Sequence, residues 1–307
     1  MKGKDAAPAI ELQLAAVYTN GYSAYVPWQQ SIGFRTHSSS YRQQGVRDSV
    51  AEAYLINSRN KRHNPENEYS ILSFLDDRGM VMVSMNGQED IPQGKLIALP
   101  NSEPLDMALG DAVTRRRSIR SYTGDQISFE FLATMIRSGC AISANVTARL
   151  MSEGNATFSF RTVPSAGGLY PIDLYIISRN VEGLAKGVYR YIPNRDALLL
   201  ERDAVKADQL LETFVVPDEI ISCRYANVIF MLVARPWKTM RKYGDRGLRF
   251  IFHETGAISQ NIHLAATALG LGSVDCASVC DDELHHMMDF DGVFQTLTHT
   301  IIVGTHG

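Results

Sequence analysis

The sequence has few cysteines, no long apolar run and no large excess of charge of either sign. Its four cysteines show no C-x-x-C spacing, which argues against a disulfide framework or a zinc cage. The longest purely apolar run, 228–234, is far too short to cross a bilayer. Thirty basic residues against 33 acidic ones leave a net charge of −3, so bulk charge favours neither nucleic acid nor an anionic membrane as a partner. Because no apolar segment follows the charged N-terminus, we expect a globular cytoplasmic protein.

Standard catalytic and nucleotide-binding motifs are also missing. Gly270-Leu271-Gly272 lacks a third glycine and follows a helix-like segment, whereas a dinucleotide fingerprint follows a strand. Neither a G-x-x-x-x-G-K-[ST] phosphate loop nor a G-x-S-x-G nucleophile elbow occurs. His253-Glu254 has no second histidine at the zincin spacing, and no metal site is predicted. The apolar neighbours of Cys140 favour a buried structural thiol over a nucleophile.

The first hundred residues differ from the rest in composition. They carry ten basic and ten acidic side chains, so the whole net charge lies beyond them. They also contain two polar stretches and two short strand-like runs, 80–83 and 96–99. We therefore place a boundary near Pro100-Asn101, between an N-terminal extension, 1–100, and a core domain, 101–307.

Beyond this boundary helical and strand patterns alternate. Periodicity predicts helices over 105–115, 128–142 and 248–269, and β-branched and aromatic residues predict strands over 173–178, 188–192, 228–234 and 300–303. The clearest helix is 248–269, with Gly270 as its stop signal. Its apolar residues recur every three or four positions, at Ile251, Thr255, Ile258, Ile262, Ala265 and Leu269. Such alternation around a mixed sheet indicates an α/β or α+β fold.

Two short segments have the residue types of a ligand site. Segment 115–120, R-R-R-S-I-R, is either a solvated basic helix terminus or an anion site in which guanidinium groups and a hydroxyl hold a phosphate. Segment 164–171, P-S-A-G-G-L-Y-P, is either a plain turn or a flat backbone surface. In the second case its small residues would let backbone N–H groups approach the heteroatoms of a planar ligand.

Two further segments combine charge or polarity with helical spacing. Segment 235–249 holds six basic residues and one acid, and such a run is usually a solvated face. It includes Lys242-Tyr243, however, and like charge from Arg241 and Arg246 is expected to lower the pKa of one of the pair toward values useful for a base. The other segment is Ser259-Gln260-Asn261 in the long helix. Polar residues at such positions normally form no more than the solvent-exposed face of a helix.

In this order the motifs resemble those of the nitroreductase superfamily. They are R-R-S-x-R at 116–120, P-S-A-G-G-L-Y-P at 164–171, E-T-G-x-x-x-Q-N at 254–261 and A-L-G-L-G-S at 268–273. The combination is most similar to the SagB-type branch, the dehydrogenases of thiazole/oxazole-modified peptide biosynthesis. The resemblance covers about 105–304 and implies an α+β sandwich, an intertwined homodimer and flavin mononucleotide (FMN) at each subunit interface.

The resemblance also implies roles for individual residues. Lys242 and Tyr243 match the Lys-Tyr pair in the active site of this branch. The residues that correspond to contacts with the flavin phosphate and ribityl chain are Arg116, Arg117, Ser118 and Arg120. Those that correspond to the loop against the isoalloxazine ring are Pro164, Ser165, Ala166, Gly167 and Gly168, and further flavin contacts fall at Gln260, Gly270 and Gly272.

The implied reaction is the FMN-dependent oxidation of azoline rings to azoles in a ribosomally made peptide, with dioxygen reoxidising the flavin. Lys242 or Tyr243 would be the base, and the residues alone leave that choice open. Two alternatives remain: a flavoenzyme that reduces quinones or nitroaromatics with NAD(P)H, and a flavin-free scaffold subunit. The branch works in multi-enzyme assemblies, so we expect a precursor peptide and a YcaO-type cyclodehydratase as partners, with 1–100 forming a face for one of them.

Overall fold

The structure is a computed structural model that describes residues 50–59, 65–86, 94–150 and 154–307. The chain divides into two compact units, 1–61 and 62–307. The described part of the first unit is the helix α3 (Val50–Asn57), and all other elements belong to the second. Within these ranges no helix has the length and apolar character needed to span a membrane. The assignment of 1–100 as an extension and 101–307 as a core domain stays a prediction.

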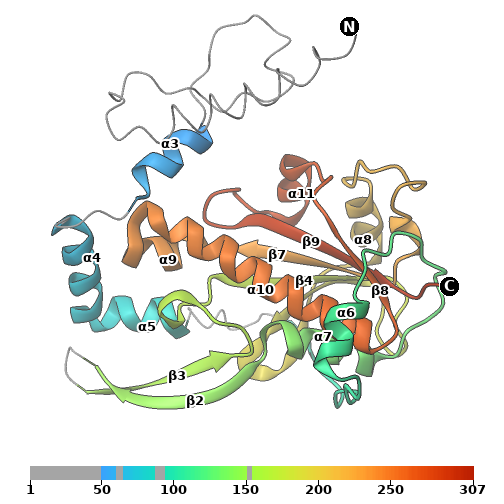
Figure 1. Ribbon diagram of the computed structural model, residues 1–307, viewed down its shortest axis with the longest axis horizontal. Coiled ribbons are helices and arrows are strands. Elements are labelled where there is room, and N and C mark those ends of the chain that lie inside the picture. The colour runs from blue at the N-terminus through green and yellow to red at the C-terminus, as the bar shows by residue number, and fades with distance from the viewer. Residues whose placement is uncertain (1–49, 60–64, 87–93, 151–153) are drawn as a thin grey trace, which may run out of the picture. The chain divides into compact units, whose positions relative to one another are not determined.

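A seven-stranded antiparallel sheet forms the centre of the second unit (Figure 1). Its strand order is β1-β6-β5-β4-β7-β9-β8. The strands are β1 (Leu96–Ala98), β4 (Ile172–Ser178), β5 (Gly187–Ile192), β6 (Ala197–Arg202), β7 (Val228–Ala234), β8 (Gly272–Cys276) and β9 (Thr296–Gly304). Every residue of β7 is buried, because this strand is central and has helices on both sides.

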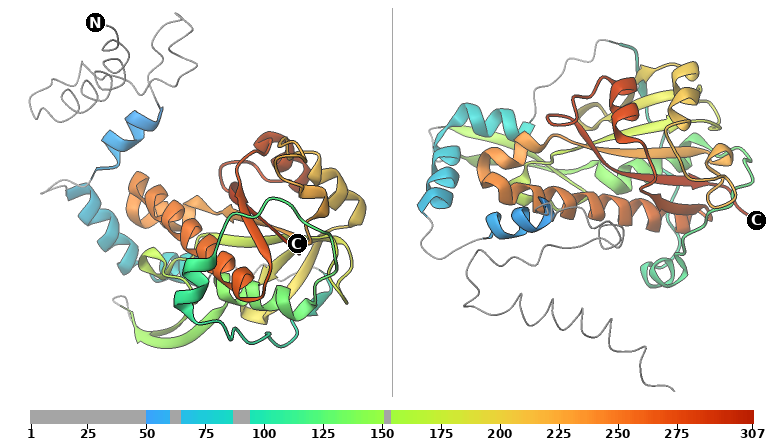
Figure 2. Two further views of the ribbon diagram at one scale, coloured as in Figure 1. Left: turned by 45° about the vertical axis from the view of Figure 1, so that its right-hand side comes forward. Right: turned by 90° about the horizontal axis from the view of Figure 1, so that it is seen from above.

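Helices cover both faces of the sheet. Side chains alternate along each strand, so one face packs on α7 (Phe129–Cys140) and α10 (Gly247–Ala268), and the other on α8 (Ala204–Leu211) and α11 (Asp281–Met288). In the left view of Figure 2 the sheet lies between α10 and the α8–α11 pair. The predicted α+β class is therefore confirmed, with antiparallel neighbours throughout the sheet.

Helix α10 agrees with the sequence pattern almost residue for residue. The predicted apolar face is buried at Ile251, Thr255, Ile258, Ile262 and Ala265. Gly270 follows with a φ of +73°, a left-handed conformation that glycine adopts without strain and that ends the helix. A charged residue, Glu254, also lies on the buried side of this helix.

A third, smaller apolar cluster lies beside the main core. Helices α4 (Pro65–Asp76) and α5 (Arg78–Asn86) contact α9 (Pro236–Tyr243) and the ribbon formed by β2 (Ile142–Arg149) and β3 (Asn155–Arg161). Figure 1 shows α4 and α5 at the end of the second unit where α9 lies. The buried members of the cluster are Phe74, Val81, Leu150, Ala156 and Leu169.

One predicted strand was wrong, because residues 80–83 are helical and belong to α5. The carboxylate of Asp77 accepts a hydrogen bond from the backbone N–H of Met80 and so caps the start of this helix. Val81 packs into the third cluster. Capping and tertiary packing therefore outweigh the strand preference of a short Met-Val run.

The other differences concern boundaries. The helix predicted at 105–115 is α6 (Leu109–Arg115), and the helix predicted at 128–142 ends at Cys140 because Ile142 enters β2. The last strand is longer than predicted and starts at Thr296. The strand expected at 96–99 is confirmed as β1.

Candidate functional site

Lys242 and Tyr243 end α9, and their side chains reach the glycine loop. A Cβ atom at Gly167 would lie 2.8 Å from Tyr243 Oη and 2.9 Å from Lys242 Nζ. Such distances are shorter than van der Waals contact, so only glycine at this position leaves room for both side-chain ends. The structure thus brings together two motifs about 75 residues apart in the sequence, P-S-A-G-G-L-Y-P and Lys-Tyr.

The loop that carries Gly167 has an unusual backbone. Gly167 and Gly168 both have φ +66°, and Tyr170 has φ +45°, a left-handed conformation that is strained for a tyrosine. The Ser165 hydroxyl accepts a hydrogen bond from Tyr170 N–H at 2.9 Å. Lys238 Nζ donates to the Tyr170 carbonyl at 3.1 Å. These bonds fix the loop so that the exposed face of Gly167 points to the end of α9.

Burial, and not like charge, shifts the pKa values of the Lys-Tyr pair. It lowers the pKa of Lys242, because a half-buried ammonium loses hydration. It raises the pKa of Tyr243, because a phenolate would be desolvated too. The expectation that Arg241 and Arg246 depress these pKa values was therefore wrong. The Arg241 guanidinium instead stacks over the Trp237 ring, 4.7 Å from its centroid.

Helix α4 forms one wall around Lys242. The ammonium lies 5.4 Å from the centroid of the Phe74 ring, and the Ser70 hydroxyl donates to the Lys242 carbonyl at 3.3 Å. Tyr243 stacks edge to face on Phe250, with centroids 5.0 Å apart. The amine and the phenol are thus held by apolar and aromatic surfaces, which suits a base that must work in its neutral form.

Two buried charged residues, Lys238 and Glu254, lie behind the loop. Their exposed fractions are 6% and 1%. Burial raises the pKa of Glu254 to about 7, with Ser165, Arg161 and Lys238 acting in the opposite direction. Burial also lowers the pKa of Lys238 to about 8, and Arg161 adds to the effect. Both groups therefore titrate near neutrality.

The arginine-rich segment packs on the start of β8. Ile119 N–H donates to the Ser273 carbonyl at 3.0 Å, and Ser118 and Ser273 form an isolated parallel bridge. Gly272 makes this approach possible, since a Cβ atom there would lie 2.6 Å from Ile119 Cγ2. The structure thus joins the first and last motifs, R-R-S-x-R and A-L-G-L-G-S.

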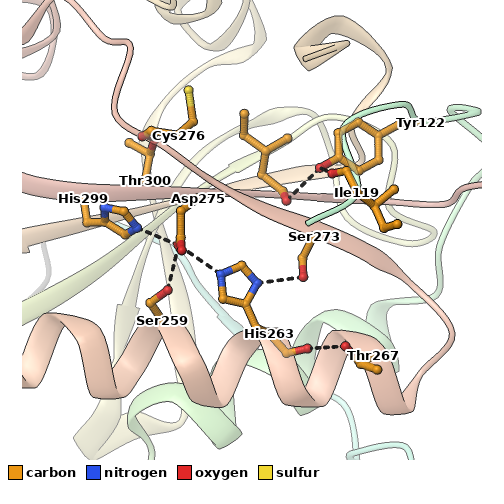
Figure 3. A network of polar contacts seen from close by, with 11 residues as sticks. Ile119, Tyr122, Ser259, His263, Thr267, Ser273, Asp275, Cys276, His299 and Thr300 are labelled. Atoms are coloured by element: carbon orange, nitrogen blue, oxygen red, sulfur yellow. Dashed lines mark hydrogen bonds and ion pairs between the residues drawn. The ribbon is translucent and has the colours of Figure 1, made fainter. Parts of the chain in front are cut away.

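A polar network anchors this second group of residues to α10 (Figure 3). Asp275 Oδ1 accepts hydrogen bonds from Ser259 Oγ at 2.8 Å, His263 Nε2 at 2.9 Å and His299 Nε2 at 2.6 Å. Burial alone would raise the pKa of Asp275, but the bonds from His263 and His299 outweigh it and hold the pKa well below its usual range. His263 Nδ1 also bonds Ser273 Oγ at 2.7 Å, so the network reaches β8 directly.

The guanidinium groups of the arginine-rich segment suit an anion. Within the described ranges none of them forms an ion pair with a carboxylate; they are those of Arg115, Arg116, Arg117 and Arg120. Arg117 donates only to nearby backbone carbonyls, and Arg120 to the Ser118 carbonyl. Uncompensated guanidinium groups beside a serine hydroxyl fit a phosphate, and a flat glycine loop fits a planar ring. The residues present therefore fit FMN.

The remaining predicted flavin contacts have different surroundings. Gln260 is exposed on α10, and a Cβ atom at Gly270 would meet nothing within 4 Å. The conformation of Gly270 is explained by the end of α10. The polar side chains of Ser259 and Asn261, expected to be the wet side of the helix, instead bond Asp275 and the Ser138 carbonyl. The flavin roles of Gln260 and Gly270 stay predictions.

Sequence reasoning missed Lys238, Glu254 and Asp275. Two signals were present: Lys238 lies one helical turn before Lys242, and Glu254 falls on the apolar side of α10 between Ile251 and Ile258. A carboxylate at such a position is expected to be buried and to have a function or a partner. Asp275 gave no local signal, because its partners come from two other elements, Ser259 and His263 from α10 and His299 from β9.

Comparison with known proteins identifies the family. Residues 113–305 match the nitroreductase family, and the chain belongs to it. A nitroreductase-family protein of Methanocaldococcus jannaschii is 30% identical over 62% of this chain and 88% of its own length. The microcin B17-processing protein McbC of Escherichia coli is 31% identical, but over 43% of this chain and 49% of the relative.

Solved structures agree with the fold. One chain of the Escherichia coli microcin synthetase McbBCD complex with truncated pro-MccB17 bound superposes with a TM-score of 0.52. Their sequences are 18% identical, and the match covers 84% of this chain and 92% of that one. The fold is thus the nitroreductase-like α+β sandwich, and family membership makes the protein a flavin-dependent oxidoreductase.

Proposed function

We propose that this protein is an FMN-dependent dehydrogenase that oxidises thiazoline or oxazoline rings to azoles in a ribosomally made peptide. The observation that carries the proposal is the convergence of Lys242 Nζ and Tyr243 Oη on Gly167 in the glycine loop. A base beside a flat, ring-binding loop is the arrangement that proton removal next to a hydride acceptor needs. The named activity of the relative McbC, the processing of microcin B17, supports the choice of a peptide substrate.

The reaction removes a proton from the ring α-carbon and a hydride from ring C5. FMN, when bound, would supply the hydride acceptor, with dioxygen as the final acceptor of the two electrons and hydrogen peroxide as the by-product. Lys242 takes the proton in this proposal, since burial lowers its pKa and so increases the fraction of neutral amine at neutral pH. Tyr243 keeps its proton, because burial raises its pKa, and it orients the substrate through a hydrogen bond.

The same residues divide the binding of FMN between them. Pro164, Ser165, Ala166, Gly167 and Gly168 would face the ring, and Arg116, Arg117, Ser118 and Arg120 would hold the phosphate. Helix α10 connects the two groups, since Glu254 lies behind the loop and His263 bonds Ser273. These two positions are about 14 Å apart along the helix axis at 1.5 Å per residue.

We also propose a homodimer that works with other proteins. Large apolar side chains are exposed on α6 and α10, among them Leu109, Val113 and Phe252. Phe252 lies one turn before Gly256, where a Cβ atom would meet nothing within 4 Å, so a second copy could approach closely. The McbBCD complex, which has truncated pro-MccB17 bound, supports a precursor peptide as substrate and an assembly of several subunits. A cytoplasmic location and a YcaO-type cyclodehydratase as partner are proposed from the motif resemblance alone.

The decisive experiment gives the purified, FMN-loaded protein an azoline peptide. Mass spectrometry should show the loss of two hydrogens per ring. Lys242→Ala should lower the rate at least about a hundredfold, the usual contribution of a positioned base. Tyr243→Phe should lower it less, and Lys206→Ala, an exposed lysine on α8, should leave it unchanged. Wild-type rates in both Lys242→Ala and Tyr243→Phe would refute the assignment.

A second candidate is the reduction of a quinone or nitroaromatic with NAD(P)H, which the Methanocaldococcus jannaschii relative favours. Rapid bleaching of the flavin by NAD(P)H, with no oxidation of azoline peptides, would establish it. A colourless protein that takes up no added FMN would instead indicate a scaffold subunit. The visible absorption spectrum therefore comes first.

A further inference from the structure

Helix α9 presents two lysines to the glycine loop, one turn apart on the same face. Lys242 is half-buried, and its ammonium reaches Gly167. Lys238 is buried, and its ammonium donates to the Tyr170 carbonyl at 3.1 Å. Lys238 bonds one end of the short segment 167–170, and the Lys242 ammonium lies next to the other end, so both lysines of α9 face the loop.

Tyr170 is the strained residue of this segment. Its φ of +45° costs a tyrosine about 1 kcal/mol or more, so the surrounding structure must hold it there. Three bonds do so: Tyr170 N–H donates to Ser165 Oγ, the Tyr170 carbonyl accepts from Lys238, and Tyr170 Oη accepts from Arg161 N–H at 3.0 Å. Of these three hydrogen bonds only the one from Lys238 has a charged donor, although the Arg161 guanidinium also lies over the Tyr170 ring, 5.0 Å from its centroid.

Glu254 provides the opposite charge without a direct contact. Ser165 and the Ile172 backbone lie close enough to its carboxyl group to lower its pKa, although neither carboxyl oxygen has a partner with full hydrogen-bond geometry in the described part of the chain. No ion pair there joins Glu254 to Lys238. The two residues nevertheless interact electrostatically, each favouring the charged form of the other. A buried carboxylate without an ion pair is costly, and this one is retained beside a buried ammonium.

We propose that Lys238 is a positioning residue: its buried ammonium, balanced by the Glu254 carboxylate, holds Tyr170 in its left-handed conformation and so places Gly167 against Lys242 and Tyr243. The Lys238 ammonium bonds the Tyr170 carbonyl, so in this proposal it acts through the loop. The inference deepens the proposed function and rests on it for the identity of the site. The loop geometry itself is independent of the substrate.

Other charged and titratable groups face this pair. Arg161 ends β3, Asp173 lies in β4 and pairs with Arg235, and Cys140 ends α7 with its pKa raised by burial to about 12. All measurements of the test should therefore be made at one pH, about 7.5, which lies between the pKa of about 7 that burial gives Glu254 and the pKa of about 8 that burial gives Lys238, so that both groups are mainly charged.

The test compares Lys238→Met, Glu254→Gln and the double variant with the wild-type protein. Hydrogen exchange of the Tyr170 amide reports on the loop without any flavin, and fluorescence titration gives the affinity for FMN. Lys238→Met alone leaves Glu254 without its balancing charge and should lower the melting temperature. The double variant removes both charges and should recover that temperature.

The variants separate two roles of Lys238, the positioning of the loop and the balancing of the Glu254 charge. In the double variant we expect the Tyr170 amide to exchange at least about tenfold faster and FMN to bind at least about tenfold more weakly, since the carbonyl has lost a charged donor. Glu254→Gln keeps the Lys238 donor and should retain both properties. Wild-type exchange and FMN affinity in the double variant would overturn the proposal, and so would loss of loop protection in Glu254→Gln alone.

The result for Lys238 can be distinguished from the result for the proposed function. If the wild-type protein binds FMN but leaves azoline peptides unchanged, the proposed function fails while the exchange and affinity data still decide the role of Lys238. If azolines are oxidised and the double variant keeps full loop protection, the role of Lys238 fails alone.

Discussion

At the scale of single residues, Gly167 connects the two halves of the candidate active site. Its left-handed φ of +66° and its missing Cβ atom are separate requirements, one of the backbone and one of the space next to Lys242 and Tyr243. Other glycines meet only the first requirement. Gly183 has φ +73°, but a Cβ atom there would meet nothing within 4 Å, so a substitution at Gly183 isolates the backbone cost.

Gly167→Ala should lower azoline turnover at least about tenfold, because the methyl group displaces the ends of Lys242 and Tyr243. Both Gly167→Ala and the control Gly183→Ala should lose about 1 kcal/mol of unfolding free energy to backbone strain. Steady-state kinetics and chemical denaturation measure the two effects. Equal turnover in the two variants would show that the space at Gly167 does not matter for catalysis.

The buried carboxyl of Glu254 predicts a pH-dependent stability. Its pKa rises from 4.5 to about 7 on folding, so the folded state holds the proton more tightly. The stabilisation is complete below pH 4.5 and is lost as pH rises through 7. From pH 5 to 8 the wild-type protein should lose up to about 3 kcal/mol relative to Glu254→Gln, which does not titrate.

Urea denaturation across this pH range measures the difference between the two proteins, so contributions from groups that do not interact with Glu254 cancel, and the remaining difference belongs to Glu254 together with Lys238. Glu130→Gln is the matched control, since Glu130 is an exposed carboxylate in the first turn of α7. A difference between wild type and Glu254→Gln that stays constant from pH 5 to 8 would contradict the buried, proton-holding state.

Sequence patterns predicted the motifs but not the causes of the pKa shifts within them. Lys242 and Tyr243 were predicted as a pair, yet the cause expected for their pKa shifts, crowding by arginines, was wrong. Charge along a chain is visible in a sequence, whereas burial depends on what packs against the side chain. Here that is Phe74, from a helix about 170 residues earlier.

At the scale of secondary-structure elements, α10 organises both parts of the site. One part of the helix carries Glu254 behind the glycine loop, and another carries Ser259 and His263, which bond Asp275 beside the arginine-rich segment. The close approach of that segment to β8 depends on Gly272, because a side chain there would collide with Ile119.

Gly272→Ala should therefore displace Ser118 to Arg120 and weaken FMN binding about tenfold, while the affinity for riboflavin, which has no phosphate, changes less. Fluorescence titration with the two flavins makes the comparison. Gly110→Ala is the control, because a Cβ atom on this residue of α6 meets nothing within 4 Å. An equal loss of affinity for both flavins would place the disturbance elsewhere than at the phosphate.

The elements differ in how well the sequence predicted them. The strand 228–234 was placed to the residue and α10 to within one, since a continuous apolar run and a sustained helical period leave little choice. The β2–β3 ribbon was missed, although 156–160 alternates Ala, Phe and Phe with polar residues. The strand prediction for 80–83 was wrong because four residues are too few to show a period. The hydrogen bond from Met80 N–H to the Asp77 carboxylate instead starts a helix there.

At the scale of the whole molecule, the segment before residue 100 contributes directly to the candidate site. Phe74 and Ser70 of α4 contact Lys242, and α5 packs on β3 and α9. The compact unit that contains these helices begins at Arg62, and the part before it is a separate unit. Removing 1–61 and removing 1–100 are therefore different experiments.

We expect the protein without 1–61 to bind FMN and to oxidise a small azoline substrate at the wild-type rate, because every described contact of Lys242 remains. The protein without 1–100 should lose turnover at least about tenfold, since Lys242 loses the Phe74 wall and gains water, which raises its pKa again. Phe74→Ala in the full chain removes the same wall alone and should shift the pH optimum upward. Full turnover and an unchanged pH profile, both in the protein without 1–100 and in Phe74→Ala, would mean that α4 has no part in the site.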